Sequence, residues 1–130
     1  MLLALLAGLV LLWVLTLIPG RALAKQVGNA AQMGPRDNLP PPSPEVIRAR
    51  NVLRNFVETL PIFLTLGLLT LHFEVSAGTA TLGACIYLAA RVAHAVCYLL
   101  GLSPWRSIAY LVALIGLATM AVPLFGLLPG

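Results

Sequence analysis

Charged side chains are scarce in this sequence. Of its 130 residues only 9% are Asp, Glu, Lys or Arg, whereas 60% are hydrophobic. A soluble domain needs about 25% charged residues to cover its surface, and a disordered chain combines low hydrophobicity with high net charge. The scarcity of charge therefore excludes both classes. Together with a mean hydropathy of +0.97, it predicts a protein embedded in lipid.

Cysteine is also scarce. The only two, Cys85 and Cys97, fall in one expected helix, about 18 Å apart along its axis, and so cannot pair with each other within one chain. We expect both to be buried packing residues without a chemical role. The sequence has no CxxC motif or Cys/His cluster, so we expect no metal site.

Long apolar runs are what the sequence has in abundance. A membrane-spanning helix needs about 20 mostly apolar residues, and four segments meet this requirement. We expect helices at about 1–20, 45–72, 76–101 and 104–128. We therefore predict an all-α membrane protein, a four-transmembrane-helix bundle formed by a single domain over residues 1–130.

The first apolar run has some features of a secretion signal. Ala22-Leu23-Ala24 resembles a cleavage site. However, no basic residue precedes the run, and the run is longer than the usual signal core of about 7–15 residues. We therefore expect it to be retained as a membrane helix.

One long polar segment, residues 20–44, separates the first two expected helices. It ends in a proline-rich stretch, which favours an extended conformation. Ser43 then predicts a helix start as the N-cap, with Pro44 in the first turn and Glu45 near the positive helix end. Ser103 is a possible cap for the last helix.

The distribution of basic residues predicts the orientation in the membrane. Lys and Arg in short loops favour the cytoplasm. The first loop is basic and Arg106 lies beside the third, whereas the second has Glu74 and no basic residue. We expect loops one and three to be cytoplasmic and both termini to lie on the opposite side. The net charge of +4 is then an orientation signal, and we expect no nucleic-acid partner.

The second expected helix carries the densest set of polar residues at membrane depth. Such groups are costly in lipid and usually mark a functional site or a polar cavity. Their spacing of three or four predicts one shared face, made of Arg48, Asn51, Arg54, Asn55 and Glu58. Arg54 and Glu58 can form an i, i+4 ion pair. Arg48 and Arg50 have an alternative role as headgroup anchors, which does not account for Asn55 and Glu58.

The third and fourth expected helices each carry a further polar set. Arg91, His94 and Tyr98 share one face of the third, and Arg106, Ser107 and Tyr110 lie near the start of the fourth. The alternatives are a packing role for His94 and an interfacial role for Trp105 and Arg106. A hydroxyl and a guanidinium near a positive helix end suit an anion such as a thiolate.

All three sets lie toward the expected cytoplasmic end. Together they supply one carboxylate, several hydroxyl or amide groups, and four guanidinium groups. This combination suits a small zwitterion with more than one carboxylate and one amine, because guanidinium groups bind carboxylates and a carboxylate binds an ammonium.

The three sets closely resemble motifs of the MAPEG family, the membrane-associated proteins of eicosanoid and glutathione metabolism. The string Arg48-x-x-Asn51-x-x-Arg54-Asn55-x-x-Glu58 is the most specific part. The strings Arg91-x-x-His94-x-x-x-Tyr98 and Arg106-Ser107-x-x-Tyr110 agree with it in order and spacing. The proline-rich loop is most similar to that of the small bacterial members. The resemblance thus implies a multi-pass protein of a bacterial inner membrane.

The resemblance also implies a four-helix bundle that assembles as a homotrimer and binds glutathione, the co-substrate, between subunits. Glutathione-binding residues would be Arg48, Asn51, Arg54, Asn55, Glu58, Arg91, His94 and Tyr98, with Glu58 on the γ-glutamyl amine. Catalytic residues would be Arg106 and Ser107 at the sulfur and Tyr110 beside them. Several members carry Arg in place of Asn51, which weakens one expected carboxylate contact.

The resemblance favours an integral membrane glutathione-dependent transferase or peroxidase that acts on lipophilic electrophiles from the bilayer. The alternative is a non-catalytic MAPEG-like membrane protein that binds another small ligand. A small multidrug exporter is disfavoured, because such exporters depend on a carboxylate in the first helix and this first helix has no charge.

Overall fold

The computed structural model describes all 130 residues, and they form a bundle of four long helices with one short additional helix. The long helices are α1 (Leu2–Val27), α3 (Pro44–His72), α4 (Ala77–Leu99) and α5 (Trp105–Phe125); α2 (Asn29–Met33) is the short one. All four long helices are long and apolar enough to cross a membrane. The predicted fold class is thereby confirmed.

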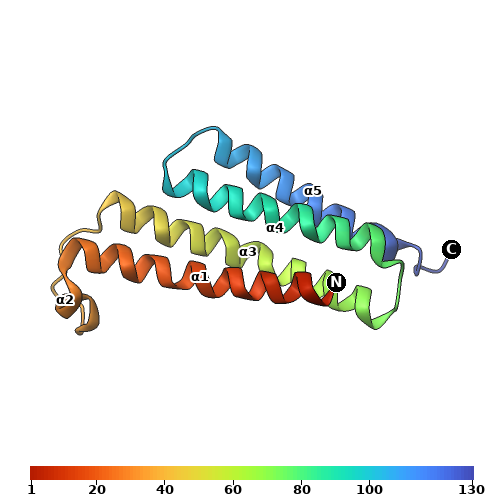
Figure 1. The fold of residues 1–130 in the computed structure, drawn as a ribbon, viewed down its shortest axis with the longest axis horizontal. Helices are drawn as coiled ribbons and strands as arrows, with labels where there is room; N and C mark the ends of the chain where they lie inside the picture. Colours follow the sequence, from red (N-terminus) through yellow and green to blue (C-terminus); the bar gives the residue numbers. More distant parts are fainter.

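The helices form two antiparallel pairs that lie against each other. In Figure 1, α1 runs beside α3, and α4 runs beside α5. The loop between α4 and α5 lies at the same end of the bundle as α2, and the C-terminus lies at the other end. This arrangement brings the first and third loops to one end, which we call the α2 end.

The end of the first helix differs most from the sequence-based expectation, and the other helix bounds differ by at most a few residues. The helix that was expected to end near residue 20 continues to Val27 and ends where Gly28 adopts φ 87°. The Ala- and Leu-rich segment after Gly20 consists of good helix formers, which continue the helix past the apolar run. The long loop also contains α2.

The expected helix caps have different outcomes. The Ser43 side chain accepts a hydrogen bond from the Val46 N–H, so the predicted cap of α3 is confirmed. Ser103 does not cap α5, because the N-cap position is Pro104 and no side chain caps that end. Helix α5 begins one residue later than expected, so Ser103 lies outside the position from which a side chain reaches the first free N–H groups.

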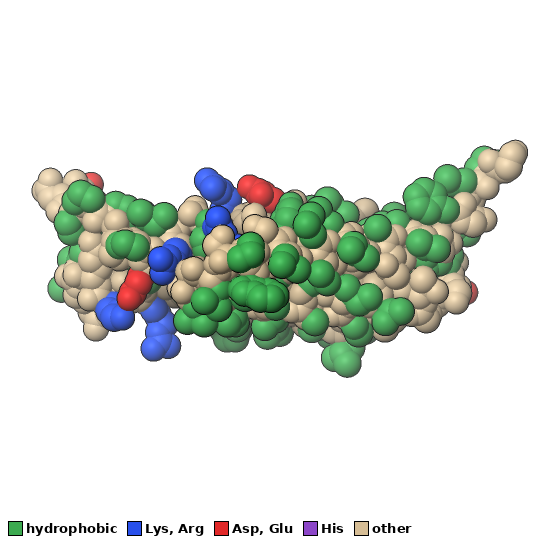
Figure 2. Space-filling model, turned by 90° about the horizontal axis from the view of Figure 1, so that it is seen from above, with side chains coloured by type: hydrophobic (Ala, Val, Ile, Leu, Met, Phe, Trp, Pro, Cys, Tyr) green, Lys and Arg blue, Asp and Glu red, His purple; other side chains and the backbone are tan.

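Both cysteines are free, but the expectation that both are buried is wrong. Cys85 is exposed on α4 and Cys97 is half-buried. Apolar side chains also cover much of the outer surface (Figure 2). In a chain surrounded by lipid an apolar residue gains nothing from facing inward, so hydrophobicity alone does not predict burial.

Small residues allow α4 and α5 to approach closely. A Cβ on Gly116 would lie 2.6 Å from the Tyr87 backbone nitrogen, and a Cβ on Gly83 would lie 2.6 Å from the Gly116 carbonyl oxygen. Only glycine fits at either position. This close crossing fixes the register between the two helices that carry most of the candidate site.

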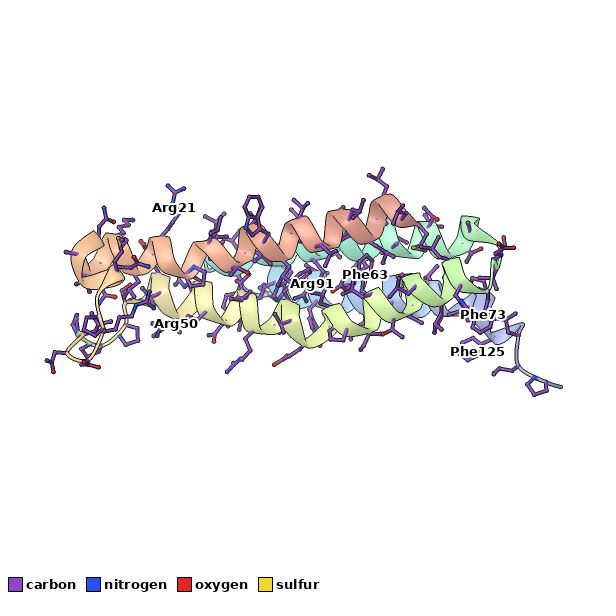
Figure 3. The ribbon with its side chains drawn as sticks, turned by 90° about the horizontal axis from the view of Figure 1, so that it is seen from below. Arg21, Arg50, Phe63, Phe73, Arg91 and Phe125 are labelled. Carbon is purple, nitrogen blue, oxygen red and sulfur yellow. The ribbon has the colours of Figure 1, made fainter.

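Tyr87 joins this pair to α3. Its ring stacks on Phe63 with centroids 4.6 Å apart, and its hydroxyl lies 2.8 Å from the Thr59 hydroxyl in a buried hydrogen bond. Phe63 and Arg91 both lie inside the bundle in Figure 3.

Candidate functional site

Six of the residues singled out from the sequence lie around one open pocket of about 410 Å³. α3 supplies one of them, and α4 and α5 supply the others. The short connection after Leu99 turns α5 back along α4, so the last turns of α4 face the first turns of α5. The lining is Asn55, His94, Tyr98, Arg106, Ser107, Tyr110 and the additional Leu111. We call this the α3–α4–α5 pocket.

Aromatic rings hold the polar groups of the pocket in place. The Arg106 guanidinium carbon lies 4.7 Å from the centroid of the Tyr98 ring, a cation–π contact. The His94 ring lies between two tyrosines, with centroids 5.6 Å from Tyr98 and 6.1 Å from Tyr110. One cation, one imidazole and two phenols are therefore grouped in a single site.

Arg91 lies one helical turn before His94 and is only 1% exposed. Its Nη1 donates a hydrogen bond of 3.0 Å to the Asn55 side-chain oxygen. Its guanidinium carbon lies 5.5 Å from the Phe56 ring centroid and 5.7 Å from the Tyr110 ring centroid. No carboxylate of the chain pairs with it, because the one ion pair present joins Lys25 and Glu45.

Several buried polar atoms here make no hydrogen bond within the chain. They are Nε and Nη2 of Arg91 and Nδ1 of His94. Buried donors and acceptors without partners are rare because each one costs desolvation energy. Arg91 does not itself line the α3–α4–α5 pocket but is bonded to Asn55, which does, so these unpartnered atoms lie directly behind the pocket lining.

Of the predicted residues of α3, only Asn55 lines this pocket. The other four do not reach it within one chain: Arg48, Asn51, Arg54 and Glu58. Arg54 and Glu58 are exposed on the outer face of α3, and the ion pair that was expected between them is not formed. Consecutive helical residues point about 100° apart, so Asn55 faces inward while Arg54 faces outward. Asn51 is half-buried and its side chain makes no hydrogen bond within the chain.

Arg48 lies nearer the α2 end. It lines a different pocket together with Lys25 and Glu45, and its guanidinium packs against Gly101, where an added Cβ would lie 3.1 Å from it. Arg48 therefore does not reach the α3–α4–α5 pocket within one chain, and headgroup anchoring stays the alternative role for it.

Leu111 is the pocket residue that the sequence reasoning missed. It follows Ser107 by four positions on α5 and so lies on the same face. Extending that face by one turn would have identified it. An exposed leucine at the mouth of a polar pocket provides an apolar wall toward the lipid.

Comparison with known protein families agrees with these features. The model of the MAPEG family matches residues 1–126. The chain belongs to the MAPEG family. A comparison with curated proteins found no significant match.

MAPEG membership accounts for the four apolar helices, and the chain is a multi-pass integral membrane protein. The family generally acts in glutathione-dependent or eicosanoid metabolism in membranes. The resemblance seen in the sequence is therefore confirmed at the level of family and fold.

Proposed function

We propose that this MAPEG protein is a glutathione-dependent transferase or peroxidase that acts on lipophilic electrophiles. The observation that carries the proposal is the α3–α4–α5 pocket, in which Arg106 and Ser107, at the start of α5, lie with two tyrosines and His94. Cationic and hydroxyl donors stabilise a thiolate relative to its thiol, and a thiolate is the reactive nucleophile.

Two buried groups are suited to holding the peptide part of glutathione. Arg91 lies behind the pocket lining and is bonded to Asn55, and its buried, unpaired Nε and Nη2 would become donors to a carboxylate that reaches past Asn55. A guanidinium binds a carboxylate through two parallel hydrogen bonds. His94 and Tyr98 would line the same part of the pocket.

In this proposal Arg106 and Ser107 lie by the sulfur, and Tyr110 flanks them. The thiol loses its proton to solvent. In conjugation, the thiolate then forms a bond to an electrophilic carbon and the leaving group departs with the displaced electron pair. In peroxide reduction, the thiolate attacks one peroxide oxygen, the other oxygen leaves and takes up a proton, and a second glutathione thiol forms the disulfide with release of water.

The lipophilic substrate would enter from the bilayer. The exposed apolar side chains of α5, among them Ile108, Leu111 and Ile115, continue from the mouth of the pocket along the helix. A hydrophobic substrate dissolved in lipid would therefore reach the sulfur without crossing water.

We further propose a homotrimer in which a neighbouring subunit completes the site. Arg54 and Glu58 lie exposed on α3 next to Asn55, and charged groups facing lipid are unfavourable. A neighbour packed on this face would shield both. Glu58 could then bind the γ-glutamyl ammonium, and Arg54 and Asn51 could contact the peptide.

The proposal predicts a defined effect of Arg106→Ala on the thiolate. Wild-type protein should bind glutathione by calorimetry and produce the ultraviolet absorbance of its thiolate. Arg106→Ala should abolish that absorbance and lower turnover of a standard electrophile by about 100-fold, the usual effect of removing one group that stabilises a reacting anion. Oligomer size should remain unchanged. A wild-type protein that binds no glutathione would contradict the proposal.

Arg50→Ala is the matched control for this test. Arg50 is also an arginine toward the α2 end, is exposed, and does not line the α3–α4–α5 pocket. It should retain both the thiolate absorbance and the turnover. Equal loss in both variants would assign the effect to the general charge of that end rather than to Arg106.

A non-catalytic role with another small ligand is the second candidate. It is favoured by the presence of Asn51 where several relatives carry Arg, and by the position of Arg48 away from the pocket. Electrophile turnover that disappears in Glu58→Ala would contradict this second candidate.

A further inference from the structure

A second polar pocket lies at the α2 end and shares no lining residue with the α3–α4–α5 pocket. It has a volume of about 600 Å³ and is bounded by α1, the α2 segment and one leucine of α3. Its polar lining includes Arg21, Arg36, Asn29 and Gln32, and its apolar lining includes Leu17 and Leu53. We call it the α1–α2 pocket.

The pocket carries two positive charges without a counter-charge. Arg21 and Arg36 both line it, and no acidic residue does. Neither arginine takes part in an ion pair, since the one ion pair joins Lys25 and Glu45. Two unneutralised guanidinium groups and two side-chain amides form a donor set suited to phosphate oxygens.

The chain fixes the position of one of these cations. Arg36 Nε donates a 2.8 Å hydrogen bond to the carbonyl oxygen of Gln32, and Arg36 adopts φ 63°, a conformation that non-glycine residues rarely adopt. The Gln32 side chain reaches α1, because a Cβ on Gly20 would lie 3.3 Å from its Nε2. Gln32, which holds Arg36, thus lies against α1 at Gly20.

The pocket also spans the boundary between apolar and polar parts of the chain. Thr16 and Leu17 belong to the apolar part of α1, and Arg21 follows one turn later. In Figure 3 the Arg21 side chain points away from the bundle, toward the surroundings rather than the core. A ligand here would therefore meet guanidinium groups at one end and leucine side chains at the other.

We propose that the α1–α2 pocket binds an anionic phospholipid. Its phosphate would lie between the guanidinium groups of Arg21 and Arg36, with the amides of Asn29 and Gln32 as further donors. An acyl chain would lie along Leu17 and Leu53. The expected cytoplasmic position of the first loop would place the pocket at the leaflet surface that is rich in anionic lipid.

Native mass spectrometry of the purified oligomer with phosphatidylglycerol or phosphatidylcholine tests this proposal. Wild-type protein should retain phosphatidylglycerol at a lipid concentration at least about tenfold lower than phosphatidylcholine, because each basic residue near anionic lipid contributes favourably. Arg21→Gln/Arg36→Gln should lose that preference. Arg50→Gln, an exposed arginine of the same end that lines neither pocket, should keep it.

Competition experiments distinguish the phospholipid from other ligands of the α1–α2 pocket. Excess inorganic phosphate or glycerol phosphate should not displace phosphatidylglycerol, and displacement would assign the pocket to free phosphate. Glutathione should not compete either; competition would assign the pocket to a neighbour's glutathione site. Equal retention of the two lipids, or equal loss in Arg50→Gln, would overturn the proposal.

Thermal unfolding provides a second readout. The melting temperature without added lipid should be the same for the wild type and the double variant, whereas phosphatidylglycerol should raise only that of the wild type. If the double variant fails to fold, Arg21→Gln alone decides the matter, because Arg21 makes no hydrogen bond with the rest of the chain. Undiminished lipid preference in that variant would overturn the proposal.

Discussion

At the residue scale, Arg91 is a buried charged side chain whose hydrogen bonds are incompletely satisfied. It is almost completely buried, yet it makes one hydrogen bond, to Asn55, and its nearest other partners are aromatic rings. A buried charge with few partners is destabilising unless another group satisfies it. The hydrogen bond to Asn55 is therefore the main polar interaction that offsets the cost of burying this charge.

Asn55→Ala tests this reading of Arg91. Without the Asn55 oxygen, the guanidinium would have no hydrogen bond within the chain, and we expect the free energy of unfolding to fall by about 1.5–3 kcal/mol. Reversible unfolding in mixed micelles, measured without glutathione, gives this value. Asn51→Ala is the control on the same helix, because the Asn51 side chain makes no hydrogen bond within the chain. An equal effect of the two substitutions would contradict the role of Asn55.

At the scale of elements, the crossing of α4 and α5 determines the site. These helices supply six of the seven residues that line the α3–α4–α5 pocket, and Gly83 and Gly116 set their separation. In a membrane, helix association relies on close packing, since lipid tails are as apolar as the side chains. A change in this separation would move Tyr98 relative to Arg106.

Gly116→Val should disrupt this pair of helices. The added side chain would meet the Tyr87 backbone at 2.6 Å, and backbone cannot move aside as a side chain can. We expect a loss of more than about 3 kcal/mol in stability, since overpacking typically costs 1–3 kcal/mol even where side chains can adjust. Circular dichroism during thermal or detergent unfolding measures this loss.

The control for this substitution is Gly78→Ala in the first turn of α4. A Cβ at Gly78 has nothing within 4 Å, and alanine is a better helix former than glycine. Stability should be unchanged or slightly higher. Wild-type stability in Gly116→Val would show that the close crossing does not control the packing of α4 on α5.

At the scale of the whole molecule, charge is separated along the bundle. Basic side chains gather toward the end that contains α2, while the remainder of the visible surface is largely apolar (Figure 2). The first and third loops lie at that end (Figure 1). By the positive-inside rule we expect this end to face the cytoplasm.

Cysteine labelling tests this orientation. In a background with Cys85→Ser and Cys97→Ser, Asn38→Cys places a thiol in the first loop and Ser76→Cys places one in the second. A membrane-impermeant maleimide should label Ser76→Cys in intact spheroplasts, and Asn38→Cys only after lysis. The reverse pattern would overturn the predicted orientation.

The sequence was sufficient for the membrane class, the four long helices and the family. Runs of apolar residues determine each helix independently, because backbone hydrogen bonds in lipid must be satisfied within the segment itself. The N-cap of α3 at Ser43 could also be predicted, since capping depends only on residues that are close in the sequence. The extension of α1 to Val27 was missed because the polar residues after Gly20 suggested a loop. Most residues of this segment are nevertheless good helix formers, and the helix continues through them.

Which polar residues of α3 face the pocket could not be predicted from spacing. Residues three or four apart share a broad face, but the packing of α3 on α4 and α5 decided that Asn55 turns inward and that Arg54 and Glu58 stay outside. Likewise, the exposure of Cys85 could not be predicted, because lipid accepts the same side chains as the core.

By itself, then, the scarcity of charge determined that the chain spans a membrane, and the order of its polar strings determined its family. Only the tertiary structure decided which of those polar residues meet. The short connection after Leu99 brings Arg106 to Tyr98, and the contact of α3 brings Asn55 to Arg91. The Asn55–Arg91 contact joins residues far apart in the chain. The geometry of both contacts depends on helix separation and rotation, which no local pattern encodes.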